Sequence, residues 1–330
     1  MRFDRYEASH QRSRLAGQLQ ARATRAGMPA IVLVLFGLPF VAVGLGAMLA
    51  GTGHIPLAAP KMNAPLWILA VFGLVFALAG GVVWNMAWRL HRANRRLREL
   101  GERNPELADY PWDQRGFTPP RWSRVIKGIG LLIFLALFLS MFNWWAFWSN
   151  GPWPVKMIVG LFDLFLVLAV WQVIMALGHA LKFGPSRIEF GRFPFRPGET
   201  VSLYWQVPRG MARVANGNFT LRCVEEWYET RGSGRNRKRT LVQEQIWSGI
   251  GHLDQPCEIL PGKTEELQFA LPAEAVGTAL SYRGSKAVFW ELVIHLDLAG
   301  LNFRESYLVP VYRQAGGGGS SEPASLRLEQ

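Results

Sequence analysis

The chain has 330 residues, of which 50% are hydrophobic and 18% are charged, and its formal net charge at pH 7 is +12. Soluble domains average about 25% charged residues, and this apolar composition also excludes a disordered or collagen-like chain. The basic balance leaves two classes: a nucleic-acid-binding protein, or a membrane protein whose Lys and Arg residues gather on the cytoplasmic side.

Four apolar segments are long enough to cross a bilayer, whose hydrocarbon core needs roughly 20 apolar residues in a helix. They occupy residues 29–50, 64–88, 129–148 and 155–181. The first two contain no charged residue. We therefore predict a bundle of four transmembrane α-helices, with helices one and two in 29–88 and helices three and four in 129–183.

Lys and Arg residues are distributed unevenly between these spans. Residues 1–28 carry six, the loop after the first span one, residues 89–128 ten, and the turn after the third span one. Because cytoplasmic flanks are enriched in Lys and Arg, this pattern predicts that the N and C termini are both cytoplasmic. The basic segments would lie beside anionic phospholipids, which attract them. The chain from Lys182 onward is nearly neutral, which weighs against nucleic acid as a partner.

Two basic segments are expected on the cytoplasmic side. Residues 1–28 form a basic N-terminal arm, predicted as an interfacial helix with disorder as the alternative. Residues 89–128 form a basic loop that begins as a helix, with Leu and Arg at helical spacing, and Asn104-Pro105 ends that helix. The Pro-rich and aromatic remainder either folds along the membrane face or packs on the C-terminal domain.

The hydrophobic period changes from helical to two in residues 184–313. The alternation is cleanest from Trp290 to Leu298, and turn signals such as Arg196-Pro197-Gly198 separate the apolar runs. About seven or eight strands with no helical pattern between them predict an all-β, antiparallel β-sandwich in the cytoplasm. The last residues, 314–330, form a Gly/Ser tail that we expect to be flexible.

The predicted sandwich resembles the arrestin-like architecture in four short motifs. They are Arg196–Glu199, Phe269–Pro272, Phe289–Ile294 and Leu308–Val311. Domains of this kind mostly bind other proteins, so the resemblance implies a binding module.

The order of the segments also resembles an uncharacterised family of bacterial inner-membrane proteins. The shared pattern is two spans, then Tyr110-Pro-Trp112 and Arg121-Trp122, two further spans and a strand domain, and it covers most of residues 60–313. This resemblance implies a multi-pass protein of the bacterial inner (cytoplasmic) membrane and carries no activity with it.

Polar residues in the third and fourth spans form the first candidate site. Asp163 lies inside the fourth span, Lys156 is seven residues earlier, and Asn143 can approach from the third span. Gln172 and His179 continue an approximate polar stripe. Intramembrane carboxylates are costly and often functional, so a proton or ion site is one interpretation. The alternative is a structural acid that pairs near the outer interface.

A cluster of basic residues forms the second candidate site. Arg231, Arg235, Arg237, Lys238 and Arg239 lie around a Gly-Ser-Gly turn between two predicted strands. Such a cluster can bind lipid headgroups, an acidic protein or nucleic acid. A solvated hairpin tip is the alternative interpretation.

Catalytic and metal-binding motifs give no support to an enzyme. No HExxH, CxxC or Walker-type loop occurs, and Cys223 and Cys257 have no metal-type spacing, so we expect no enzymatic activity and no cofactor. Small residues at four-residue spacing in the first two spans allow close helix packing, either within the chain or in a homo-oligomer.

The preferred function is a scaffold or accessory subunit of an inner-membrane complex that recognises a protein partner. The alternative is proton or ion transport through Asp163.

Overall fold

Four long helices dominate the first half of the chain. The computed structural model describes residues 30–55, 65–101, 104–211, 213–231, 237–253, 256–280 and 286–313. The predicted arm 1–28 and tail 314–330 lie outside these residues. The helices are α2 (Ala30–Gly51), α3 (Leu66–Leu100), α5 (Arg121–Asn143), which continues as the π-helical turn η1 (Trp144–Trp148), and α6 (Trp153–Phe183). All four are long and apolar enough to cross a membrane, as predicted.

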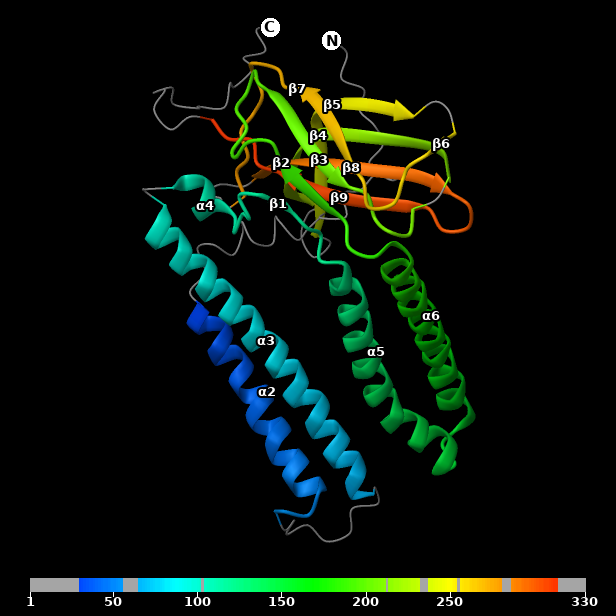
Figure 1. The fold of residues 1–330 in the computed structure, drawn as a ribbon. Coiled ribbons are helices and arrows are strands. Elements are labelled where there is room, and N and C mark those ends of the chain that lie inside the picture. The colour runs from blue at the N-terminus through cyan, green and yellow to red at the C-terminus, as the bar shows by residue number, and fades with distance from the viewer. Residues whose placement is uncertain are drawn as a thin grey trace, which may run out of the picture.

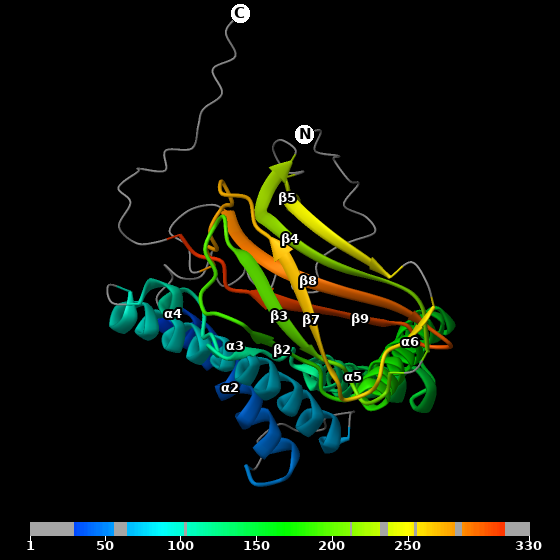
Figure 2. The same ribbon diagram turned by 45° about the horizontal axis from the view of Figure 1, so that its top comes forward.

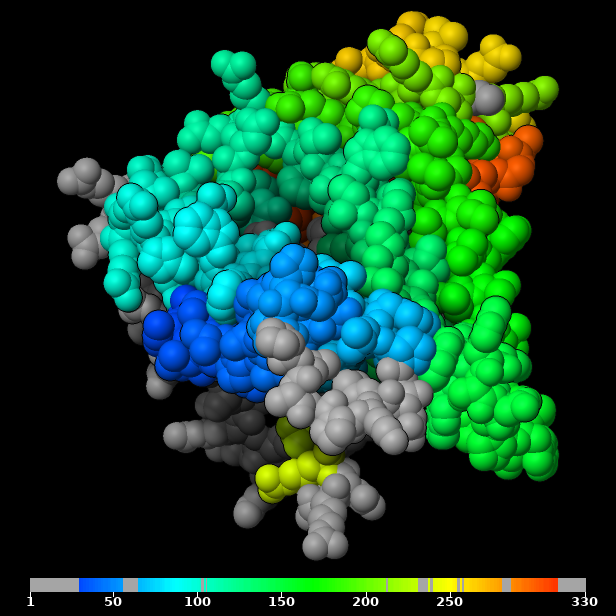
Figure 3. Space-filling view, turned by 90° about the horizontal axis from the view of Figure 1, so that it is seen from below, coloured from blue at the N-terminus to red at the C-terminus, as the bar shows by residue number. Residues whose placement is uncertain are grey.

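The helices form two hairpins, α2 with α3 and α5 with α6 (Figures 1 and 3). In the first hairpin the backbones meet at glycines, because a Cβ on Gly44 or Gly73 would overlap backbone atoms of the opposite helix. Gly46 and Gly81, which have the small-residue spacing noted in the sequence, have no neighbour at the Cβ position. The two hairpins touch where Trp67 of α3 meets Trp144 of η1 edge-on, with ring centroids 6.4 Å apart.

The second half of the chain folds into two antiparallel sheets. The first sheet has the order β1 (Gly116–Phe117), β2 (Arg187–Phe190), β3 (Thr200–Gln206), β7 (Thr264–Ala270). The second has the order β5 (Lys238–Leu253), β4 (Arg213–Arg231), β8 (Lys286–Leu298), β9 (Phe303–Val309), and β6 (Cys257–Glu258) pairs with β4. The predicted all-β, antiparallel character is confirmed, and the strand order is now defined.

The hydrophobic core lies between the two sheets (Figure 2). In β3, alternate side chains enter it, as the period of two predicted, and Val201, Leu203 and Trp205 are fully buried. In β8, Leu292 and Ile294 are fully buried, but residues 287–294 are buried on both faces of the strand. Burying each such side chain stabilises the fold by about 1.5–3 kcal/mol.

The segment between α3 and α5 belongs structurally to the β domain. After α4 (Pro105–Asp109), the indole nitrogen of Trp112 donates a hydrogen bond to the hydroxyl oxygen of Tyr312 at 2.9 Å. Strand β1 then pairs with β2, with Gly116 opposite Glu189. Of the two predicted placements, packing on the C-terminal domain is therefore observed. The predicted boundary of that domain at residue 184 omits its first strand. A strand of two residues is too short to show the two-residue hydrophobic period.

Two further contacts fix the β domain on the helices. Arg124 of α5 forms a salt bridge with Glu305 of β9 at 3.0 Å. Phe183, at the end of α6, packs edge-on against Phe303 of β9 with ring centroids 5.2 Å apart. Strand β9 is thus the edge of the second sheet that faces the helices, and β5 is the opposite edge (Figure 1).

Candidate functional site

The predicted contact between the third and fourth helices exists. The side-chain amide of Asn143, the last residue of α5, donates a hydrogen bond to the carboxylate of Asp163 at 3.0 Å. The same amide nitrogen lies 3.2 Å from the carbonyl oxygen of Leu139. Both polar side chains are half-buried on the face where α5 and α6 meet. The pair therefore links the two helices across their interface.

The remaining predicted polar residues do not continue this site as a stripe. Gln172 is exposed on the outside of α6, because nine residues at 100° each place it half a turn away from Asp163. His179 packs at the helix end, where its ring stacks on Phe303 of the β domain at 6.3 Å. Lys156 is half-buried, and it lies seven residues before Asp163 on roughly the same face of α6. The structure thus brings together Asn143 and Asp163 and separates them from Gln172 and His179.

The basic hairpin lies largely outside the described residues. Its strands are in register, with Arg231 of β4 opposite Lys238 of β5. Arg237 is exposed. Arg235, and the side chains of Arg231, Lys238 and Arg239, fall outside what the structure describes, so the predicted binding role of this cluster stays a prediction.

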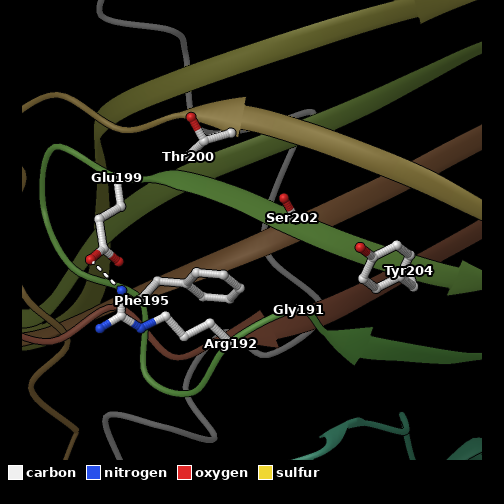
Figure 4. Close-up of a pocket in the computed structure, with 7 residues that line it drawn as sticks. All are labelled: Gly191, Arg192, Phe195, Glu199, Thr200, Ser202 and Tyr204. Atoms are coloured by element: carbon white, nitrogen blue, oxygen red, sulfur yellow. Dashed lines mark hydrogen bonds and ion pairs between the residues drawn. The ribbon is translucent and has the colours of Figure 1, made fainter.

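A shallow pocket of about 400 Å³ lies on the outer face of the first sheet (Figure 4). It is lined by Ser202 and Tyr204 of β3 and by the loop between β2 and β3. Its two charged residues, Arg192 and Glu199, form a salt bridge at 2.8 Å. Because these charges neutralise each other, the pocket presents a polar surface without a free charge of either sign.

The most distinctive surface of the β domain lies at β5 and β7, the end strands of the two sheets, where Phe269 of β7 approaches Gly249 of β5. Five large apolar residues here pack against the core but remain only half-buried. We call them the edge seam: Ile246, Trp247 and Leu253 of β5, and Leu267 and Phe269 of β7. Trp247 reaches inward to Trp290, with ring centroids 5.2 Å apart. The seam is thus a line along which the core is accessible from solvent.

Sequence reasoning missed the edge seam. Its signal was weak but present: Gly249 and Gly251 occupy alternate positions of β5, opposite Leu221 and Phe219. The ring of Trp247 lies over Gly249, whereas Gly251 leaves the core without a covering side chain at its position. Recognising this required the register, which places those glycines on the inward face.

Titratable and metal-binding groups give no further site in the part of the chain that the structure describes. No three His, Cys, Asp or Glu side chains converge there. Cys223 is buried in the core, and this burial, with a smaller effect of Glu225, raises the pKa of its thiol to about 12. At neutral pH the thiol is therefore protonated and a poor nucleophile.

The fold and these surfaces define a class of protein: four apolar helices joined to a two-sheet antiparallel β domain. No family model and no curated protein matches the sequence. Among solved structures, the sporulation control protein Spo0M of Bacillus subtilis matches with a TM-score of 0.28 and 16% sequence identity, over 39% of this chain and 49% of that chain. The match thus spans about half the length of Spo0M, and a likeness of this extent carries no conclusion about function.

Proposed function

We propose that this protein is a membrane-anchored binding protein, a scaffold or accessory subunit whose β domain recognises a protein partner. The observation that carries the proposal is the position of the edge seam. It lies on the β5–β7 side of the domain, whereas the helices contact the opposite edge, at β9. Half-buried apolar side chains at an accessible edge are typical of protein-binding surfaces.

The membrane anchor is supported by the exposed surface of the helices. Leu161, Phe165 and Leu168 of α6 are each about half exposed or more, as are many other large apolar residues of the four helices. In water such a surface would be strongly unfavourable, and in a bilayer it contacts lipid. The 31 residues of α6 span about 46 Å, which is enough to cross the hydrocarbon core and continue to the β domain.

The proposed orientation places the β domain and both termini in the cytoplasm of a bacterium, with the inner membrane as location. Its support is that the basic end of α3, the start of α5 and the end of α6 all lie on the side of the β domain (Figure 1). Arg98, Arg121 and Lys182 mark these ends. The positive-inside rule then assigns this side to the cytoplasm, where anionic phospholipids are further partners. The proposal includes an arrestin-like type for the β domain, supported by its two antiparallel sheets.

Transport through Asp163 has less support. The Asp163 carboxylate accepts a hydrogen bond from Asn143 across the α5–α6 interface, which accounts for an intramembrane acid by helix pairing. Gln172 and His179, which would have to extend a polar path, lie on other surfaces.

Site-specific photo-crosslinking in cells tests the binding role. A benzoylphenylalanine replaces Ile250, which is 54% exposed on the outer face of the end strand β5, between Gly249 and Gly251 and within reach of a chain bound along this strand. The full chain is then purified in mild detergent. A matched control carries the crosslinker at Leu161, which is 55% exposed on α6. We expect one protein to be captured reproducibly from position 250 and not from position 161. If the chain purifies alone and position 250 captures no protein, the binding role is wrong.

A further inference from the structure

We propose that the partner binds by strand addition: an extended segment of the partner protein pairs with the free edge of β5 at residues 247–253. This inference rests on the proposed binding role and names its mode. An unpaired strand edge presents a row of backbone N–H and C=O groups, and an added strand satisfies them.

Among the residues that the structure describes, no strand pairs with the second edge of β5. Its first edge pairs with β4. The register with β4 shifts between Cys223 and Val224, which leaves Ile246 as an extra residue in β5. Bulges of this kind twist a strand and interrupt edge pairing. The regular stretch that follows, from Trp247 to Leu253, is the part suited to an incoming strand.

The inward face of this stretch has room for side chains from an added strand. Gly249 and Gly251 carry no side chain there, between Trp247 and Leu253. The ring of Trp247 lies over Gly249, so the open position is Gly251. A Cβ on Gly251 would have only Phe219 nearby, at 3.8 Å or more. A strand beside β5 would place an apolar side chain over Gly251 and others against Trp247 and against Leu267 and Phe269 of β7. It would thereby complete the cover of the core.

The other edges of the sandwich are less suited. Strand β9 contacts α5 and α6 through Glu305 and Phe303. Strand β7 begins with charged residues, and Glu265 and Glu266 are both exposed. Charged residues on an edge strand disfavour strand addition. In β5, residues 247–253 contain no Asp, Glu, Lys or Arg.

The occupant is a segment of another protein and not a second copy of this chain in the same membrane. In a sheet made continuous through two β5 strands, the β9 strand of the second copy would lie farther from the bilayer than β5. Its helices would lie farther still, because they contact β9. Two copies anchored in one bilayer therefore cannot pair in this way. The partner segment is extended, with apolar residues at alternate positions that face the seam.

The probe for this inference is a phage-displayed library of random 12-residue peptides, selected against the full chain in detergent. We expect the enriched peptides to alternate apolar and polar residues. Hydrogen exchange followed by mass spectrometry, with and without one selected peptide, should show at least about tenfold slower exchange within 247–253, because backbone pairing protects edge amides. This measurement needs no substitution and so does not depend on the folding of a variant.

Two lysine substitutions on neighbouring residues of β5 provide the matched comparison. In Gly251→Lys the charge points into the seam and can reach solvent only while the edge is open. In Ile250→Lys the charge points to the opposite face of the sheet. We expect Gly251→Lys to weaken peptide binding at least about tenfold, and Ile250→Lys to change it by less than about threefold.

The outcomes separate the mode of binding from the binding role. Peptides that bind but protect amides outside β5 overturn strand addition and leave the binding role intact. A stronger loss with Ile250→Lys than with Gly251→Lys overturns it as well. If no peptide is enriched and position 250 crosslinks no protein, both proposals fail.

Discussion

The indole nitrogen of Trp112 lies 2.9 Å from the hydroxyl oxygen of Tyr312, although 200 residues separate them in the chain. The Tyr312 hydroxyl in turn donates a hydrogen bond to the carboxylate of Asp109 at 2.9 Å, and this carboxylate also accepts from the backbone N–H of Leu280. The connection between α3 and α5 is thereby held against the last residues of the β domain. This connection is therefore part of the β domain.

Removing the hydroxyl of Tyr312 should destabilise this junction. In Tyr312→Phe the indole N–H of Trp112 and one oxygen of Asp109 lose their shared partner, at a cost of about 1–3 kcal/mol. Thermal unfolding of the full chain in detergent measures the effect. The control is Tyr204→Phe, on the outer face of the first sheet, which should shift the unfolding temperature little. Equal shifts for the two variants would contradict a structural role of the junction.

Stability should fall at alkaline pH. Burial raises the pKa of the Cys223 thiol from 9.0 to about 12, and burial together with Asp109 raises the pKa of the Tyr312 hydroxyl. The folded state therefore keeps both protons where the unfolded chain loses them. The corresponding stability is complete below pH 9 and decreases above it, by up to about 1.4 kcal/mol per pH unit for each group. Unfolding temperatures measured from pH 7 to 10.5 should decline, and less so in Cys223→Ala. A flat profile would contradict these pKa directions.

The buried ion pair between Arg222 and Glu291 should show strong coupling. The guanidinium Nη2 of Arg222 lies 2.6 Å from the carboxylate Oε1 of Glu291, and the two side chains are 7% and 0% exposed, respectively. Glu291→Leu removes the carboxylate that faces the buried guanidinium of Arg222, and this should lower the free energy of unfolding by about 3–5 kcal/mol. The double variant Arg222→Met, Glu291→Leu should be less destabilised than the sum of the single variants. The unfolding free energies of the unchanged chain, the two single variants and the double variant, measured in one detergent, form a double-mutant cycle. Additive changes in these free energies would argue against coupling.

Asp163→Asn should not change the flux of protons or ions across the membrane. We expect no difference in proton or ion flux between proteoliposomes with this variant, proteoliposomes with the unchanged chain, and empty liposomes, because Asp163 is paired with Asn143 as a helix contact. Asp163→Leu should instead loosen the α5–α6 hairpin, which faster proteolysis in detergent would reveal. A flux that the unchanged chain supports and Asp163→Asn abolishes would restore the transport alternative.

The orientation can be tested with single cysteines in a chain whose native cysteines are replaced. Thr52→Cys lies in the turn after α2 and Arg209→Cys in an exposed turn of the β domain. We expect a membrane-impermeant maleimide to label position 52 in intact bacterial spheroplasts and position 209 only after permeabilisation. The reverse labelling pattern would invert the proposed topology.

Much of the architecture was predictable because its signals are local. An uncharged run such as that of α2 is recognisable from composition, and the alternation from Trp290 to Leu298 follows from the two-residue repeat of a strand. The contact between Asn143 and Asp163 was also anticipated, since a tight turn joins their helices. The polar stripe through Gln172 was wrong, because its nine-residue offset from Asp163 opposes the helical repeat.

The sequence by itself determined the four apolar helices, the change to an all-β domain and the uneven distribution of basic residues. Each depends on chain neighbours and on hydrophobic period. Only the tertiary structure decided which strand edge stays open, which face of β5 carries Gly249 and Gly251, and that Trp112 meets Tyr312. These relationships depend on strand order and register, which are set by packing between residues far apart in the chain.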